Sequence, residues 1–519
     1  MENLPILRQY IIDRYSASAF NTCEQQPLPL MQESPPLRLF LNPDVQPIAV
    51  HSPAAVPLHL DAPVRAGLER DLRLGVIERV PVNTPTTWCS RMIITPKHDG
   101  TPRRVVDFQA VNAHCPRQTH HTQSPWEIAS SVPPHTVKTT LDAWHGYQSV
   151  PIHPRDRHIT TFMTKQGRFQ YRTTPQGLLS AGDGYTQRFD EIIGSFPNHL
   201  KCVDDSILWN DDISSNFYAT CSFLDKCSAG GIIFNREKFT FASEEVDYLG
   251  FRITKNGLKP TAEFVENIAT FPIPKSITDV RSWFGCVQQI AYTFAVSEVM
   301  LPFRQLLRPQ VPFTWNEELN EAFLASKEEI VRQCEKGVRL FDLSAPTGLA
   351  TDWSKHCMGW WLIQKHCSCP DPPRLGCCKT GWQTVFCGSK FTSRAESRYA
   401  PIEGEAAAVI LGLDKCRHFV LGLPNFLLAI DHKPLVAIFG STHLDDIPNP
   451  RLFRLKQKSL RYRFTPCHVS GKKNIVPDTF SRRSDTLDNK HGVETVTSST
   501  YSSTMGPQIG WRLLLFMGV

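Results

Sequence analysis

The pattern of hydrophobic and polar residues divides the chain into segments of different kinds. Apolar side chains recur at helical spacing in APVRAGLERDLRLGVIERV (62–80), whereas TWCSRMIITPKHDGTPRRVVDF (87–108) is patterned as two strands around a His-Asp-Gly turn. Mixed strands and helices continue to about residue 255. Residues 261–340 are patterned mainly as helices, and a second mixed pattern runs from near Gly337 to near Arg483. We therefore predict two α/β regions joined by a helical one.

Both ends of the chain lack this periodicity. Residues 1–60 are rich in proline, which predicts an extended lead-in, and the tail from residue 484 is rich in Ser and Thr, which predicts disorder.

Two adjacent aspartates, Asp204 and Asp205, stand between short apolar runs in KCVDDSILWNDD. The flanks predict two strands that meet at a tight turn formed by Asp-Asp-Ser. Carboxylates held there repel each other unless a cation binds, although other Asp doublets at 211/212 and 445/446 make the doublet alone weak support. Asp142, at the end of a strand in TTLDAWHGYQSVPI, is a candidate third ligand. Three such carboxylates suit two Mg²⁺ ions and phosphoryl transfer.

A second set of acids lies in the C-terminal half. Asp352 falls in a strand-turn-strand pattern, Asp431 ends the strand of NFLLAIDHKPL, and Asp478 precedes a final helix. PIEGEAAAVILGL predicts a helix that begins with acidic residues, in agreement with the helix dipole. Acids brought together from these elements would form a second two-metal site.

Composition limits the class of protein. The 519 residues are 41% hydrophobic and 20% charged, which predicts globular domains, about three at roughly 150 residues each. The N-terminus has no apolar signal-peptide core, and no apolar run approaches the ~20 residues of a membrane span. Sixteen cysteines without a secretory signal predict reduced thiols in the cytosol or nucleus.

Positive charge is concentrated in residues 451–483, which contain ten Lys/Arg and one acid. Phe453, Tyr462 and Phe464 are interleaved with these basic residues, a composition that suits a nucleic-acid backbone. A solvated basic helix face explains this segment equally well.

Five pieces of the first half resemble the reverse transcriptases of gypsy-type LTR retrotransposons, in the family's order and near its spacing over residues 60–260. They are DGTPRRVVDFQAVN, LDAWHGYQSVPI, RFQYRTTPQGL, CVDD and FNREKFTFASEEVDYLGFRIT. One departure is Cys202, where the family usually has Tyr or Phe before Val-Asp-Asp. That position lies beside the primer in the family, so the change bears on fidelity or primer handling more than on metal binding.

The resemblance implies roles for individual residues. Asp142 and Asp204 would be the metal ligands of the palm, with Asp205 as a supporting carboxylate. The implied nucleotide-binding residues are the triphosphate-contacting Arg103, a second cation at Lys97, the aromatic gate against a 2′-hydroxyl at Tyr147, and the nucleotide-contacting Gln176. Taken singly, Arg103 could belong to a surface ion pair, Tyr147 could be a core aromatic and Gln176 could be a turn residue.

The second half, over residues 338–483, resembles the RNase H domain that follows the polymerase in the same family. The matching motifs are TDWS, IEGEAAAV, IDHKPL and VPDTFSRR. The implied metal ligands are Asp352, Glu405, Asp431 and Asp478. Glu403 competes with Glu405, and the family pattern favours the acid just before the Ala-rich run. His468 matches a mobile histidine that assists proton transfer or product release.

A cysteine-rich insert, HCSCPDPPRLGCCKTGWQTVFC, follows the strand after Asp352. His366, Cys367, Cys369, Cys377 and Cys378 could hold a structural zinc. The spacing is not that of a standard two-pair knuckle, which favours a hairpin insert with free thiols.

We therefore expect a multidomain α+β and α/β chain: a right-hand polymerase of fingers, palm and thumb around a four-stranded antiparallel sheet, followed by an RNase H-like domain with a five-stranded mixed sheet. The expected divisions are a lead-in (1–60), fingers and palm (61–256), a helical thumb/connection (257–337), an RNase H-like domain (338–483) and a disordered tail (484–519).

The expected activities are RNA- and DNA-templated DNA synthesis and hydrolysis of RNA in RNA/DNA hybrids. Each site would use two Mg²⁺ or Mn²⁺ ions, and the partners would be an RNA template, a DNA primer, RNA/DNA hybrid and dNTPs, with no membrane. The setting would be a retroelement particle in the cytoplasm or the nucleus, where the chain could form a homodimer or join other retroelement proteins.

A decayed or host-adopted copy that only binds nucleic acid is the alternative, and the presence of all seven expected acids disfavours it. The sequence lacks a protease motif before residue 60, a capsid-type zinc knuckle and an integrase. We therefore expect a processed piece, a truncated copy or an incomplete reading frame.

Overall fold

The computed structural model describes residues 3–31, 35–96, 101–308, 311–370, 375, 377–378 and 381–469. The chain divides into two compact units. Unit 1 comprises Met1–Leu249 and Ile253–Lys255, and unit 2 comprises Gly250–Arg252 and Asn256–Val519. Among the described helices, we find none that is both long enough and apolar enough to cross a bilayer.

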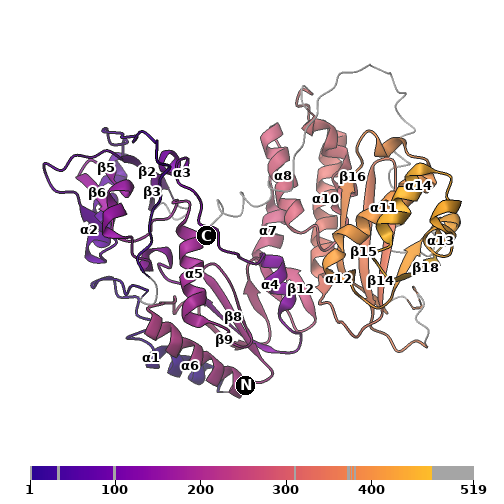
Figure 1. Ribbon diagram of the computed structural model, residues 1–519, viewed down its shortest axis with the longest axis horizontal. Helices are drawn as coiled ribbons and strands as arrows, with labels where there is room; N and C mark the ends of the chain where they lie inside the picture. The colour runs from indigo at the N-terminus through magenta and orange to yellow at the C-terminus, as the bar shows by residue number, and fades with distance from the viewer. Residues whose placement is uncertain are drawn as a thin grey trace. The chain divides into compact units, whose positions relative to one another are not determined.

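The first sheet of unit 1 has the strand order β1-β6-β5-β2-β3 (Figure 1). Its strands are β1 (Ile77–Arg79), β2 (Ser90–Pro96), β3 (Pro102–Asp107), β5 (Phe162–Thr164) and β6 (Gly167–Tyr171). β2 and β3 pair antiparallel, as the alternating pattern predicts, and the His-Asp-Gly turn between them lies outside the described residues. α2 (Leu58–Arg73) packs against β3, where Arg104 Nη1 lies 2.9 Å from Asp71 Oδ2.

The prediction of a helix over residues 62–80 is wrong for the second part of this range. α2 ends at Arg73, Gly75 adopts a left-handed φ of 70°, and the chain then enters strand β1. The Gly75 and Val76 amides donate to the carbonyls of Leu72 and Asp71, which closes the end of the helix. The spacing of apolar residues alone does not predict this helix end.

The second sheet of unit 1 is four-stranded and antiparallel, as predicted, with the order β7-β8-β4-β9. Its strands are β4 (Val137–Asp142), β7 (His199–Cys202), β8 (Asp205–Asn210) and β9 (Thr240–Ser243). α6 (Ile213–Gly230) packs on β4 and β8, and α5 (Ala181–Ile193) packs on α6. Asp212 of the second doublet caps α6 by accepting from the Ser215 amide, which gives that doublet a structural role.

The remaining elements of unit 1 are short. They are α3 (Gln109–Asn112), α4 (Pro125–Ser131), η1 (Tyr147–Ser149), η2 (Pro154–Thr160) and β10 (Val246–Tyr248), and β11 (Phe251–Ile253) follows where the two units divide the chain.

The proline-rich N-terminal residues form part of the core of unit 1. After α1 (Leu4–Arg14) the chain forms turns over residues 15–20, and Phe20 and the later Leu37 are buried in the same large hydrophobic cluster. The Leu37 amide donates to the Pro151 carbonyl, and the His153 amide donates to the Leu37 carbonyl. The prediction of an extended lead-in over residues 1–60 is wrong at α1 and at the start of α2 at Leu58. The burial of this segment depends on contacts that are distant in sequence.

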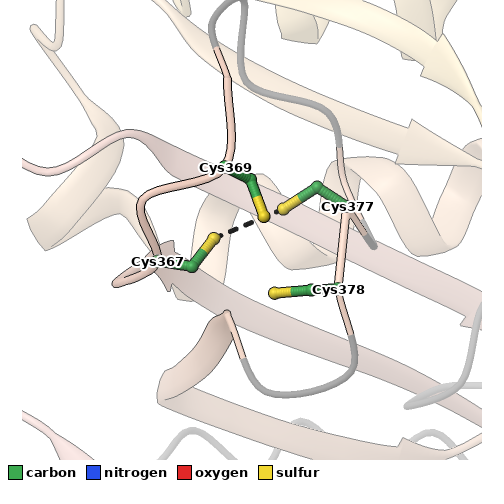
Figure 2. Close-up of side chains that lie close together, drawn as sticks. All are labelled: Cys367, Cys369, Cys377 and Cys378. Carbon is green, nitrogen blue, oxygen red and sulfur yellow. Dashed lines mark hydrogen bonds between the residues drawn. The ribbon is translucent and has the colours of Figure 1, made fainter.

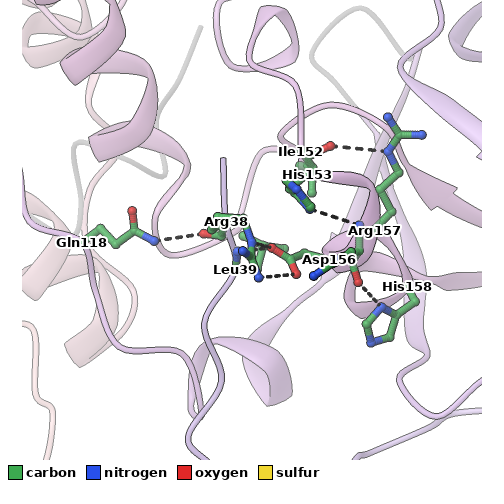
Figure 3. Close-up of polar contacts among 9 residues, drawn as sticks. Arg38, Leu39, Gln118, Ile152, His153, Asp156, Arg157 and His158 are labelled. Carbon is green, nitrogen blue, oxygen red and sulfur yellow. Dashed lines mark hydrogen bonds and ion pairs between the residues drawn. The ribbon is translucent and has the colours of Figure 1, made fainter. Parts of the chain in front are cut away.

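A buried carboxylate anchors this segment to η2 (Figure 3). Asp156 Oδ2 lies 2.6 Å from Arg38 Nε and accepts the Leu39 amide at 3.0 Å. Gln118 donates to the Arg38 carbonyl from the opposite side. Asp156 thus satisfies both a charged side chain and a backbone donor of the N-terminal segment.

Unit 2 begins with a mainly helical part, in agreement with the sequence pattern. Its elements are β12 (Gly257–Pro260), α7 (Ala262–Thr270), α8 (Ile277–Gln289), α9 (Val296–Val299), η3 (Leu301–Leu307), α10 (Glu317–Lys336) and β13 (Val338–Arg339). Thr261, Ser276 and Asn316 cap α7, α8 and α10 with side-chain oxygens. Trp283 and Phe323 pack edge to face in the core of these helices.

The rest of unit 2 contains a five-stranded mixed sheet, as predicted, with the order β16-β15-β14-β17-β18. The strands are β14 (Thr347–Trp353), β15 (Cys357–Lys365), β16 (Trp382–Phe391), β17 (Phe426–Ile430) and β18 (Phe464–His468). β14 runs antiparallel to β15 and parallel to β17, and β17 runs parallel to β18. The helices of this part are α11 (Pro401–Lys415), α12 (Arg417–Val420), α13 (Lys433–Phe439) and α14 (Pro450–Ser459). α11 lies on β14 and β15, and α14 lies on α11 (Figure 1).

Candidate active sites

The hairpin β7–β8 places the first aspartate doublet. Cys202 pairs with Asp205, so the two turn residues are Val203 and Asp204, one position earlier than the predicted Asp-Asp-Ser turn. Val203 has a φ of 54°, a conformation that is strained for a β-branched residue. The sheet register therefore overrides local turn preference, and Asp205 becomes the first residue of β8.

Three carboxylates meet at this end of the sheet. Asp142 stands opposite Asp205 in the antiparallel β4–β8 register. The Ala143 amide donates to the Asp204 carbonyl at 2.9 Å, which fixes the turn against the end of β4. Lys238 Nζ lies 3.1 Å from Asp142 Oδ2 and supplies partial charge compensation.

The Asp204 carboxylate is largely buried beside Gly146. Its Oδ1 is buried without a hydrogen-bond partner, and a Cβ on Gly146 would lie only 2.7 Å from it. Burial, then Asp205 and Asp142, raises the pKa of Asp204 from 3.8 to about 7. Burial, then Asp142, raises the pKa of Asp205 to about 6. Buried, mutually repelling carboxylates of this kind fit a divalent cation with oxygen ligands.

The predicted nucleotide-binding residues that the structure describes lie on different elements of unit 1. Tyr147, in η1, is partly buried, and its ring packs edge to face on Tyr185 at 5.7 Å between centroids. Arg103 is exposed on β3 of the first sheet, and Gln176 is exposed in a turn. Lys97 lies outside the described residues.

Sequence reasoning missed two residues that shape this region. Asn112 donates to the Gly177 carbonyl and accepts the Leu179 amide, both at 2.8 Å, and so holds the turn that carries Gln176. Tyr185 is fully buried between Tyr147 and the Asp204 turn. Asn112 is the last residue of the DGTPRRVVDFQAVN motif, so its place in that motif was an available signal.

The second carboxylate group lies in unit 2. Asp352 is on β14, Glu405 is on α11 and Asp431 follows β17, and their ligand atoms all lie within 4.8 Å of one another. Among the described residues of unit 1, Asp142, Asp204 and Asp205 do not form so tight a group. Glu405 is 8% exposed, and burial, then Asp431 and Asp352, raises its pKa well above the usual range.

Strand register and helix packing together create this group. β14 and β17 pair in parallel with Ala350 opposite Ala429, and each aspartate follows two residues after its alanine. Both carboxylates therefore leave the same edge of the sheet. α11 approaches closely because it has glycines where it meets β14, and a Cβ on Gly404 would lie 2.2 Å from the Trp353 ring.

Glu403 and Glu405 have different surroundings. Glu403 accepts from Asn449 Nδ2 at 3.0 Å and from Arg451 Nη1 at 2.5 Å, and these contacts tie α11 to the start of α14. The three-carboxylate group contains Glu405, whereas Glu403 is not part of it within the described chain.

His468 ends β18, next to β17. It is exposed, and its Nε2 lies 3.0 Å from the Asp431 carbonyl oxygen. This contact places the imidazole beside the backbone of a predicted ligand. Asp478 lies outside the described residues.

Two family models match the chain. The model for reverse transcriptase (RNA-dependent DNA polymerase) matches residues 95–253, and the model for the RNase H-like domain found in reverse transcriptase matches residues 342–462. These two matches agree with the two folds and the two carboxylate groups. Together they define the class of protein: a reverse transcriptase joined to an RNase H-like domain.

Transposon polyproteins of Schizosaccharomyces pombe (strain 972 / ATCC 24843) are similar over most of the chain. The Tf2-3 and Tf2-7 polyproteins are each 25% identical over 423 residues, which cover 80% of this chain and 30% of the polyprotein. The two domain matches and this similarity support a retrotransposon pol segment with reverse transcriptase and RNase H-like domains, and the chain spans about 30% of the length of these relatives.

Solved structures of a foamy viral protease-reverse transcriptase share the fold. The complex with dsDNA has a TM-score of 0.74 at 19% identity and covers 89% of this chain and 92% of that chain. The complex with RNA/DNA hybrid has a TM-score of 0.71 at 19% identity and covers 96% of this chain and 62% of that chain. These matches confirm the predicted polymerase and RNase H-like architecture.

Proposed function

We propose that the chain copies RNA and DNA templates into DNA and hydrolyses RNA in RNA/DNA hybrids. The observation that carries the proposal is the presence of two partly buried carboxylate groups, one in each unit, within segments matched by the two family models. Each group concentrates negative charge where a divalent cation would relieve it.

In unit 1, Asp142 and Asp204 would bind the metal ions, and Asp205 would support them. Two Mg²⁺ or Mn²⁺ ions would activate the primer hydroxyl and stabilise the leaving oxygen. The buried Asp204 Oδ1 has no protein donor, which keeps it available as a ligand. The β4–β8 register and the Ala143 amide fix the turn, which supports ligand positions that would be set before substrate binds.

The substrates of this site would be a dNTP, a DNA primer and an RNA or DNA template. Arg103 and Lys97 would contact the triphosphate, and Gln176 would touch the nucleotide. Tyr147 would lie under the sugar and exclude a 2′-hydroxyl, a role supported by its packing against Tyr185, which restricts its ring.

In unit 2, Asp352, Glu405, Asp431 and Asp478 would hold two Mg²⁺ or Mn²⁺ ions against the RNA strand of a hybrid. His468 would transfer a proton or assist product release, and its contact with the Asp431 carbonyl supports a position beside the reacting phosphate. Arg454 and Lys458, the exposed basic residues of α14, would contact the nucleic-acid backbone.

The setting would be a retroelement particle in the cytoplasm or the nucleus, where the chain could form a homodimer or join other retroelement proteins. Free thiols at all sixteen cysteines support a reducing compartment.

Two single-residue variants test the two activities separately. Primer extension on an RNA template with Mg²⁺ should be lost in Asp204→Asn and kept in Asp431→Asn, whereas cleavage of an RNA/DNA hybrid should show the reverse pattern. Asp211→Asn, an exposed aspartate in the neighbouring doublet, is the matched control and should keep both activities. Hybrid binding without extension or cleavage in the unaltered chain would instead favour a copy that only binds nucleic acid.

A further inference from the structure

Four cysteines gather in the insert between β15 and β16. The Sγ atoms of Cys367, Cys369, Cys377 and Cys378 all lie within 4.8 Å of one another, and those of Cys367 and Cys377 are 3.4 Å apart. Figure 2 shows the four side chains pointing toward a common centre from two backbone segments. His366 is exposed, and its imidazole is not part of the group.

Contacts at the end of the hairpin hold these segments together. Lys365 Nζ donates to the Cys369 carbonyl at 2.6 Å, and the His366 amide donates to the Gly381 carbonyl at 2.7 Å. A Cβ on Gly381 would lie 2.4 Å from Cys367 Sγ and 2.5 Å from Cys378 Sγ. The sulfur atoms therefore occupy the space above this glycine, which no side chain could share.

Core packing does not explain this group. Cysteines elsewhere in unit 2 are mostly buried as small apolar residues, for example Cys334, Cys387 and Cys416. Cys377 is exposed, and the other three members of the group are only partly buried. An insert of this length is too small to form its own hydrophobic core, and such segments are commonly stabilised by a metal or a disulfide.

We propose that Cys367, Cys369, Cys377 and Cys378 form a structural zinc site that closes the β15–β16 insert. Zn²⁺ takes four thiolates in a tetrahedron at about 2.3 Å, which requires sulfur atoms roughly 3.8 Å apart. The observed grouping needs only small side-chain adjustments to reach that spacing. On binding, the four thiols release their protons to solvent and coordinate as thiolates.

The arrangement explains why the spacing is unlike a standard knuckle. Cys-x-Cys and Cys-Cys each supply two ligands from one backbone segment, and the hairpin brings the segments face to face. Thiolate ligands select a soft ion, so the site differs in metal preference from the carboxylate groups, which suit Mg²⁺. The zinc site is thus independent of the proposed catalytic function.

Metal content of the full chain tests the proposal. The chain is purified under reducing conditions with excess Mg²⁺, which occupies the carboxylate groups. Elemental mass spectrometry should then find one zinc per molecule. Cys378→Ser should raise the Kd for Zn²⁺ roughly tenfold or more, whereas Cys23→Ser, at an exposed cysteine in unit 1, should leave it unchanged.

A Co²⁺ titration of the unaltered chain gives a second readout that does not depend on how a variant folds. Thiolate-to-cobalt charge transfer and a tetrahedral absorption band at one equivalent are expected. Absence of these bands together with absence of zinc would overturn the proposal. Loss of two hydrogens in the intact mass of the freshly isolated chain, located to these cysteines, would overturn it in favour of a disulfide.

Discussion

Asp142 and Asp205 stand opposite each other in the register of β4 and β8, and the turn before β8 adds Asp204 to the same end of the sheet. The strands thus hold three carboxylates together with Lys238 as the cation paired to one of them. Folding without a divalent ion must bury these carboxylates beside one another. Burial first, and then repulsion from the neighbouring aspartates, raises the pKa of Asp204 to about 7 and that of Asp205 to about 6.

Without metal, the free energy of unfolding of unit 1 should decrease as pH rises from about 4 to about 7. Folded Asp204 keeps its proton up to about pH 7, whereas the unfolded residue loses it near 3.8, so the native state binds more protons in this window. At pH 8, Asp204→Asn should be more stable than the unaltered chain by roughly 1–4 kcal/mol. Urea unfolding at several pH values measures this difference.

Mg²⁺ should remove that difference by stabilising the unaltered chain alone. Asp211→Asn is the control and should follow the unaltered chain at every pH. Equal stability of Asp204→Asn and the unaltered chain at pH 8 would contradict the cost of ionising the buried Asp204.

Gly404→Ala should reduce hybrid cleavage while leaving primer extension intact. The added methyl group would meet the Trp353 ring at 2.2 Å, so α11 must move away from β14 and carry Glu405 away from Asp352. We expect destabilisation of unit 2 by roughly 1–3 kcal/mol. Thermal unfolding and a hybrid-cleavage assay on the same preparation report the two effects.

Gly285→Ala is the matched control, because its Cβ would meet nothing within 4 Å on α8. It should leave cleavage unchanged and stabilise the helix slightly. Normal cleavage by Gly404→Ala would show that α11 is not held at this distance.

Glu405→Gln and Glu403→Gln should separate a metal ligand from a structural contact. Glu405→Gln removes the charge of the proposed ligand and should lower the rate of hybrid cleavage by ~100-fold or more. Glu403→Gln weakens the contact with Arg451 and should cost about 1 kcal/mol of stability with little loss of rate. Single-turnover cleavage and urea unfolding of both variants distinguish these outcomes, and a reversed order of the two rates would show that Glu403 is the ligand.

Asp156→Ala should loosen the N-terminal segment. It removes the partner of Arg38 and the acceptor of the Leu39 amide, with an expected loss of roughly 2–4 kcal/mol. Limited proteolysis should then cleave near residues 35–45 at lower protease concentrations. Asp44→Ala, at an exposed position in the same segment, should keep the original resistance. Unchanged proteolysis of Asp156→Ala would mean that the apolar contacts alone hold the segment.

Local sequence patterns were sufficient to predict the type and order of most helices and strands. They were also sufficient to identify the acidic residues of both carboxylate groups. Strand alternation predicts β2 and β3, and an aspartate at the end of an apolar run predicts Asp142 and Asp431 at strand ends, because these features depend on neighbouring residues alone. Local patterns could not predict where α2 ends or which residues form the turn before β8. Val203 disfavours a left-handed turn locally, and only pairing with β4 and β7 overcomes that preference.

The sequence by itself determined which residues carry charge, sulfur or conformational freedom, and in what order. Tertiary structure alone decided which of them meet: Glu405 joins Asp352 and Asp431 while Glu403 binds Arg451, and four cysteines on two segments converge. It also decided that the proline-rich N-terminal segment is buried, where the backbone of Leu37 forms hydrogen bonds with Pro151 and His153. The physical reason is that strand register, helix approach and burial arise from contacts between residues far apart in sequence, which local patterns do not encode.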